Sequence, residues 1–107
     1  MSPGPLFVVT SSVESSAEET WNRWYDEEHL DEVMASSPAI ESATRYRRRY
    51  GDAGDQYLAA YSFADRDGLE SFVRDERLER MAADFERRWG AVSAIRWGAY
   101  LPIAHRG

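Results

Sequence analysis

Apolar and polar residues alternate along the chain with two different periods, and together they mark out six elements. Short runs rich in β-branched and aromatic residues predict four strands, over 5–12, 39–50, 56–63 and 93–103. Apolar residues that recur every three or four positions predict helices over 14–30 and 64–89. The segment 51–55 is rich in glycine and aspartate, so it is expected to join the second and third strands as a hairpin loop.

The first helix has an apolar stripe that stops before the helical pattern does. The stripe consists of Ala17, Trp21, Trp24 and Tyr25. Continuing the same face at a period of 3.6 residues leads to Glu28 and Glu32, which are not core residues. The pattern therefore predicts two pieces: a helix that ends near His29, and a short second turn that Asp31 caps.

The second helix also changes its apolar face part of the way along. Its first face carries Leu69, Phe72 and Val73, and its second carries Leu78, Met81, Ala82, Phe85 and Trp89. Because one straight helix cannot turn both sets toward the same core, we expect a jog near Asp75.

The order strand–helix–strand–strand–helix–strand predicts an α+β, ferredoxin-like βαββαβ fold with an antiparallel four-stranded sheet and both helices on one face. The strands are nevertheless apolar on both sides: Leu6 and Val8 alternate with Phe7 and Val9. A sheet with one wet face alternates apolar and polar residues. We therefore expect a homodimer that packs sheet face against sheet face with two-fold symmetry.

Composition narrows the range of partners. The 107 residues form one domain, 1–107, with 104–107 as a flexible tail. A net charge of −6 disfavours nucleic acid and anionic membranes, and the single basic run at 45–50 is short. With no cysteine, no signal-peptide pattern and no apolar run of about 20 residues, the expected location is cytoplasmic.

One stretch of the chain is similar to a known motif. The residues "WYDEEHLDEVMASSPAIESATRYR", 24–47, resemble the W-Y-x-x-E-H-L stretch on helix one in a branch of the dimeric α/β-barrel superfamily. Asp31 stands where the family usually has proline, and Pro38-Ala39 replaces Pro-Gly. The resemblance implies a barrel-forming dimer with a pocket between sheet and helices. The superfamily includes monooxygenases, polyketide cyclases, isomerases and lyases, so the fold alone leaves the reaction open.

His29, Tyr25 and Glu28 are the candidate catalytic residues. A histidine can move protons at neutral pH, and a carboxylate beside it fixes its tautomer. A phenol such as Tyr25 can orient a carbonyl or stabilise an enolate. The structural alternatives remain open: His29 can fill the break between the two helical pieces, Tyr25 can be a core residue, and Glu28 can be exposed.

The candidate substrate-binding residues are mainly aromatic: Trp24, Glu32, Arg45, Tyr61, Phe85 and Trp89. The aromatic members are expected to form walls, with core packing as the alternative for Trp24. Arg45, if it points inward, can pair with Glu28 or Glu32 or hold an anionic substrate.

Together with the resemblance, these residues favour a cofactor-independent enzyme with no metal, acting by acid/base chemistry on an apolar aromatic or polyketide-like carbonyl compound. Cyclisation, dehydration, isomerisation and lyase cleavage all fit His29 as the acid and base. One alternative is a cofactor-free monooxygenase, in which a carbanion formed by His29 meets O₂. Another is a non-catalytic homodimer that binds a small molecule or serves in assembly.

Overall fold

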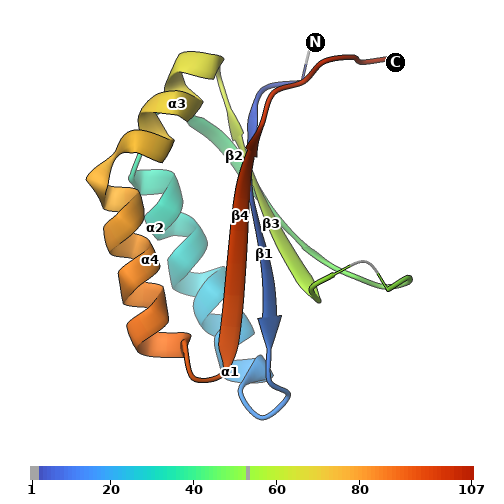
Figure 1. Ribbon diagram of the computed structural model, residues 1–107, viewed down its shortest axis with the longest axis vertical. Coiled ribbons are helices and arrows are strands. Elements are labelled where there is room, and N and C mark those ends of the chain that lie inside the picture. Colours follow the sequence, from blue (N-terminus) through green and yellow to red (C-terminus); the bar gives the residue numbers. More distant parts are fainter. Residues whose placement is uncertain (1–2, 53) are drawn as a thin grey trace.

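The computed structural model describes residues 3–52 and 54–107. Helices cover one face of a single antiparallel sheet (Figure 1). The elements in chain order are β1 (Leu6–Val13), α1 (Glu18–Trp24), the π-helical segment η1 (Tyr25–His29), α2 (Leu30–Ala35), β2 (Ile40–Arg47), β3 (Tyr57–Phe63), α3 (Arg66–Arg74), α4 (Glu76–Trp89) and β4 (Ser93–Tyr100). The strand order β2-β3-β1-β4 confirms the predicted α+β, ferredoxin-like fold.

The strands are shorter than the sequence predicts at two places. β2 ends at Arg47 rather than at Tyr50, and beyond its end the Arg48 N–H bonds to the Gln56 carbonyl at 2.8 Å. β4 ends at Tyr100 rather than at Ile103, because β1 begins at Leu6 and the following residues have no strand beside them. The irregular, exposed tail therefore starts at residue 101, not at 104.

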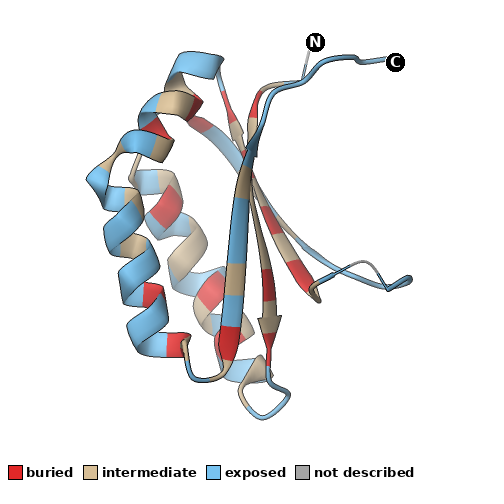
Figure 2. Ribbon diagram, viewed as in Figure 1, coloured by how far each residue is buried: buried red, intermediate tan, exposed pale blue. Residues whose placement is uncertain are grey.

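The core lies between the helices and the sheet, as the buried residues in Figure 2 show. On β3 every second residue is buried: Tyr57, Ala59, Tyr61 and Phe63. The register sets Phe7 of β1 opposite Tyr61, so the inward residues of neighbouring strands form one continuous layer. Trp21, Tyr61 and Phe63 are the largest side chains with almost no exposed surface.

The first helix does not break, which corrects the prediction of two pieces. α1, η1 and α2 follow one another without interruption, and within η1 the Leu30 N–H bonds to the Tyr25 carbonyl five residues earlier. This wider turn adds one residue to the helix and moves the inward positions one residue along. His29 and Val33 therefore take the places where a regular helix would put Glu28 and Glu32, and Asp31 caps nothing.

The predicted jog in the second helical region is confirmed. Asp75 separates α3 from α4, with extended backbone angles (φ −75°, ψ 137°). Its carboxylate accepts a hydrogen bond from the Arg77 backbone N–H at 2.8 Å, which supplies a partner for one of the free N–H groups at the start of α4.

Within residues 3–52 and 54–107, no helix or strand covers the face of the sheet opposite the helices (Figure 1). Leu6, Val8, Leu58 and Ala60 lie on this face and are only half-buried in a single chain. The sheet-to-sheet homodimer inferred from these residues stays a prediction.

Candidate functional site

A small cavity lies between the helices and the sheet, and its walls are almost entirely apolar. Its volume is about 50 Å³. The sheet contributes Phe7, Val9, Tyr61, Ile95 and Trp97, and the helices contribute Tyr25, His29, Val33, Phe72, Leu78, Met81, Ala82 and Phe85. The polar side chains among them are His29, Tyr25, Tyr61 and the indole of Trp97. Any acid/base chemistry in this cavity therefore depends on one imidazole and two phenols.

The π-helical turn aims the His29 ring into this cavity, and three neighbours fix its orientation. The ring stacks on Trp24, with centroids 4.6 Å apart and planes at 19°. It meets Tyr25 edge-on, at 4.9 Å and 89°. On the solvent side, Nδ1 lies 3.2 Å from the Glu32 carboxylate. Packing and one polar contact therefore hold a ring whose side chain exposes only 11 % of its surface.

This environment keeps His29 neutral. Burial lowers the pKa of His29 below its ordinary value of 6.5; the Glu32 carboxylate opposes that shift, and the Arg45 charge adds to it. Because a carboxylate only accepts hydrogen bonds, the neutral ring carries its proton on Nδ1 and donates it to Glu32. Nε2 then has a free lone pair at neutral pH, so it can act as a base.

Two buried phenols face the same cavity. Burial raises the pKa of Tyr25 and, much more strongly, that of Tyr61 above the ordinary value of 10.0, so both are protonated at neutral pH. The Tyr25 phenol is close enough to influence the pKa of Tyr61, yet the Tyr61 hydroxyl forms no hydrogen bond within the described part of the chain. A buried hydroxyl without a partner is costly, and it can donate to a ligand oxygen that enters the cavity.

Arg45 points toward the helices but does not reach the cavity. Its guanidinium lies 4.3 Å from the Tyr25 ring centroid, and Arg45 is not among the residues that line the cavity. It bonds the Asp26 carboxylate at 2.5 Å and the Asn22 amide oxygen at 2.8 Å. The predicted inward arginine therefore exists, but its partner is Asp26, not Glu28 or Glu32. This pair braces the outer side of the π-helical turn.

The remaining candidates differ in where they lie relative to the cavity. Phe85 and Tyr61 line the cavity. Trp24 and Trp89 do not: Trp24 supports the His29 ring from behind, and Trp89 packs on Trp24 at 5.4 Å. Glu28 is exposed and away from the lining, whereas Glu32 touches the imidazole.

Sequence reasoning missed a large part of the lining. Phe7, Val9, Ile95 and Trp97 come from β1 and β4, and Met81 from α4. The signal for the strand residues is their alternation: every second position of β1 and β4 faces the helices, and the register pairs Val9 with Trp97.

Comparison with known proteins gives one family and several solved structures of the same fold. The family model described as a domain of unknown function, DUF4286, matches residues 5–95. No curated protein sequence matches the chain. Among the described residues, no helix is long and apolar enough to cross a membrane.

Solved structures share the fold at low identity. SnoaB, a cofactor-independent oxygenase from Streptomyces nogalater, superposes with a TM-score of 0.62 and 16% identity over 97% of each chain. An ethyl tert-butyl ether degradation (EthD) family protein from Bacillus halodurans C-125 gives a TM-score of 0.59 and 11% identity, covering 88% of this chain and 96% of its own. HapK from Hahella chejuensis gives 0.60 and 10% identity, covering 96% and 98%.

Proposed function

The chain belongs to the DUF4286 family of domains of unknown function, and we propose that it is a small cofactor-independent enzyme that deprotonates an apolar aromatic or polyketide-like substrate. His29 is the base in this proposal. The observation that carries it is a neutral imidazole, tied to Glu32 through Nδ1, on the wall of an otherwise apolar cavity. A free Nε2 in such a place has little structural use and suits proton abstraction.

The reaction we favour is oxygenation. Nε2 takes a proton from an activated CH₂ group, and the electron pair stays on the substrate as an enolate or phenolate. This electron-rich anion reduces O₂. The CH₂ carbon becomes a carbonyl with one oxygen atom, and the second oxygen atom leaves as water with the two hydrogens. The substrate supplies all four electrons, so the balance requires no further reductant.

Two observations support oxygenation over the other reactions. The cavity walls are apolar, which suits O₂ and keeps water away from a reactive anion. SnoaB, whose fold this chain shares, is by its name a cofactor-independent oxygenase. The likeness is one of fold, so the reaction itself rests on His29 and its surroundings.

Cyclisation or isomerisation is the second candidate, and the Tyr61 hydroxyl favours it. This buried, unpaired donor can hold an enolate oxygen while His29 returns the proton to a different carbon. Such a reaction consumes no O₂. Tyr61→Phe is expected to reduce kcat of this reaction by about 10²-fold, because it removes the donor that holds the enolate oxygen.

An oxygen electrode with a panel of hydroxyarenes and polyketide-like ketones tests the proposal. We expect O₂ uptake that His29→Gln reduces by about 10²–10⁴-fold, while His105→Gln, in the exposed tail, leaves the rate unchanged. Product formation without O₂ uptake, but with the same loss in His29→Gln, supports the second candidate. Full activity of His29→Gln on a substrate that turns over contradicts both.

We also propose that the protein works as a homodimer through the open face of the sheet. Leu6, Val8, Leu58 and Ala60 would be covered there by a second copy. Sedimentation equilibrium should give twice the 12.3 kDa mass of the chain at micromolar concentration, and a mass of one chain would contradict this.

A further inference from the structure

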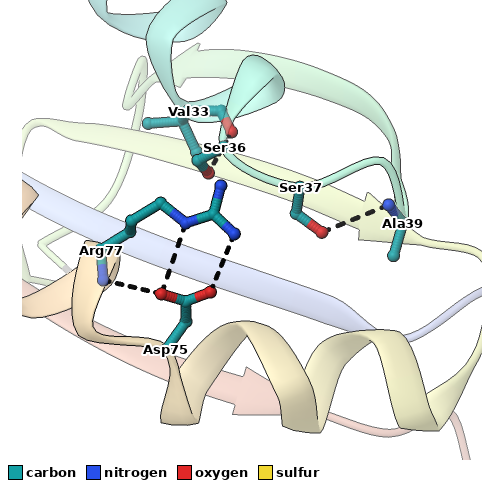
Figure 3. A network of polar contacts seen from close by, with 6 residues as sticks. All are labelled: Val33, Ser36, Ser37, Ala39, Asp75 and Arg77. Atoms are coloured by element: carbon teal, nitrogen blue, oxygen red, sulfur yellow. Dashed lines mark hydrogen bonds and ion pairs between the residues drawn. The ribbon is translucent and has the colours of Figure 1, made fainter.

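A second hollow lies next to the cavity, and the reaction proposed above makes no use of it. It is a cleft of about 190 Å³ between the end of α2 and the junction of α3 with α4. Figure 3 shows the polar groups at its two sides: Ser36 and Ser37 after α2, and Asp75 with Arg77 at the junction. Ser71 of α3 also lines it.

The cleft and the cavity have two wall residues in common, Phe72 and Leu78. Phe72 is 4% exposed and packs against Phe7 and Phe63, with ring centroids 5.0 and 5.3 Å away. Leu78 is only half-buried, in the first turn of α4. Leu78 is therefore the part of the divider that can change rotamer without disturbing the core.

The cavity alone is too small for the proposed substrate. Its volume is about 50 Å³, and an apolar cavity that takes up benzene has a volume of about 150 Å³. An aromatic ring beside His29 therefore needs more space than these walls enclose. Movement of Leu78 would join the cavity to the larger cleft and provide the missing space.

The charges in the cleft indicate which chemical group it would accept. The Arg77 guanidinium pairs with the Asp75 carboxylate, at 3.1 Å from Nη2, so the ion pair has no net charge. No other cationic side chain lines the cleft within the described residues. An anionic group placed there would lose its hydration and gain no net positive charge in exchange.

The hydroxyl groups in the cleft still have unused hydrogen-bonding capacity (Figure 3). The Ser37 hydroxyl oxygen accepts a bond from the Ala39 N–H at 3.2 Å, and its own proton remains free to donate. The Ser36 hydroxyl donates to the Val33 carbonyl at 2.6 Å, and its oxygen remains free to accept. Neutral hydroxyl or carbonyl groups match this combination of donors and acceptors.

We propose that the cleft is a second subsite, which holds a neutral, oxygen-bearing end of the same substrate whose aromatic ring lies beside His29. Leu78 moves aside so that one molecule spans both spaces. The substrate class is then an aromatic compound with an uncharged hydroxyl or keto extension, not a carboxylate. The assignment of the ring to His29 rests on the proposed function; the preference of the cleft does not.

Three probes with one ring and different ends test the preference: 2-(1-naphthyloxy)ethanol, 1-naphthyloxyacetate and 1-ethoxynaphthalene. Calorimetry with the full chain should show the alcohol binding about 3- to 10-fold more tightly than the other two, which is the effect of one added hydrogen bond. Equal affinities, tighter binding of the acetate, or no binding of any probe up to its solubility would overturn the proposal.

Two variants locate the preference in the cleft. Ser37→Ala should bring the affinity for the alcohol down to that for the ethyl ether, without weakening the ether. Leu78→Trp should weaken all three probes about tenfold by fixing the divider in place, whereas Leu101→Trp, in the exposed tail, should not. An unchanged preference in Ser37→Ala would contradict the assignment.

NMR of the backbone amides and the imidazole of the unaltered protein tests whether one ligand reaches both spaces. Titration with the alcohol should shift the His29 ring signals and the Ser36 and Ser37 amides with a single dissociation constant. Shifts confined to one of these sets would exclude a ligand that spans both spaces. The two proposals can fail separately. If His29→Gln turns over substrate at the normal rate, the proposed function is wrong. If the same variant keeps the preference for the alcohol, the subsite is still supported.

Discussion

The helical layer changes its inward face twice, and the two changes are built differently. At Tyr25–His29 the helix continues, and one wider turn, closed by the bond from Leu30 N–H to the Tyr25 carbonyl, shifts the face. At Asp75 the helix stops, the backbone becomes extended, and a new helix starts under the Asp75 cap. The wide turn keeps the helix continuous while it shifts the inward face by one residue, whereas the extended residue Asp75 separates two helices.

The two changes of face place a rigid wall on one side of the cavity and an adjustable wall on the other. The π-helical turn holds His29 between Trp24, Tyr25 and Glu32, so the base has one orientation. The Asp75 junction borders the wider cleft and carries the half-buried Leu78 just after it. A fixed base next to an adjustable wall is the arrangement that a substrate larger than the cavity requires.

Single-residue deletions should give the largest effect, because they distinguish the π-helical turn from a regular helix. Deleting the exposed Glu27 closes the wide turn to a regular one and leaves Val33 facing the core, so we expect a cost of about 0.5–3 kcal/mol in unfolding free energy.

Deleting the exposed Arg80 is the matched control in a regular helix. It rotates Phe85 and Trp89 by about 100° away from the core, and we expect a chain that does not fold. Circular dichroism and urea unfolding measure both variants. Equal losses for the two deletions would contradict the account of η1 as one inserted residue.

Removing the cap should affect only the Asp75 junction. Asp75→Ala leaves the Arg77 N–H without its partner, so Tm should fall by about 4–8 °C, whereas Asp75→Asn, which still caps, should stay within 2 °C. Calorimetry measures both. An unchanged Tm in Asp75→Ala would mean that the cap does not stabilise the start of α4.

Acid should lower the stability of the π-helical turn and of the Asp75 junction in different pH ranges. The pKa of His29 is lowered from 6.5, so the unfolded chain takes up this proton first, and stability falls as pH drops below 6.5 toward the pKa in the folded state. The Arg77 backbone N–H lowers the pKa of Asp75 from 3.8, so the cap contributes above that pH and is lost as pH falls through the lowered pKa. His29→Gln should remove the upper window and Asp75→Asn the lower one, in urea unfolding from about pH 2 to about pH 8.

The sequence carries enough information for the fold but only for part of the site. The apolar alternation in β3 and the change of apolar face near Asp75 are local signals, and the strand and the jog that they predict are both confirmed. The sequence shows that the apolar stripe of the first helix is interrupted at Glu28. An interrupted stripe is equally compatible with a break in the helix and with a wider turn. The choice between them depends on how the whole helix packs against the sheet, which no short window contains.

The site shows the same limit. His29 stands out in the sequence because it interrupts an aromatic helix, and its placement in the cavity wall follows from the shifted phase. The partner of Arg45 could not be read in the same way, because Asp26 becomes its neighbour only through the pairing of β2 with β3 and the packing of α1. Local pattern thus predicts which residues are unusual, and tertiary packing decides what they touch.

His29 is the base on which the proposed reaction depends, and its geometry implies a neutral ring with its proton on Nδ1. Nitrogen-15 NMR of the imidazole, titrated from pH 4 to 8, tests it most directly, with His105→Gln to assign the two histidines. We predict a His29 pKa below 6.5, the Nδ1–H tautomer at neutral pH, and a further decrease of that pKa in Glu32→Gln. A pKa above 6.5, or a neutral ring with its proton on Nε2, would contradict the account.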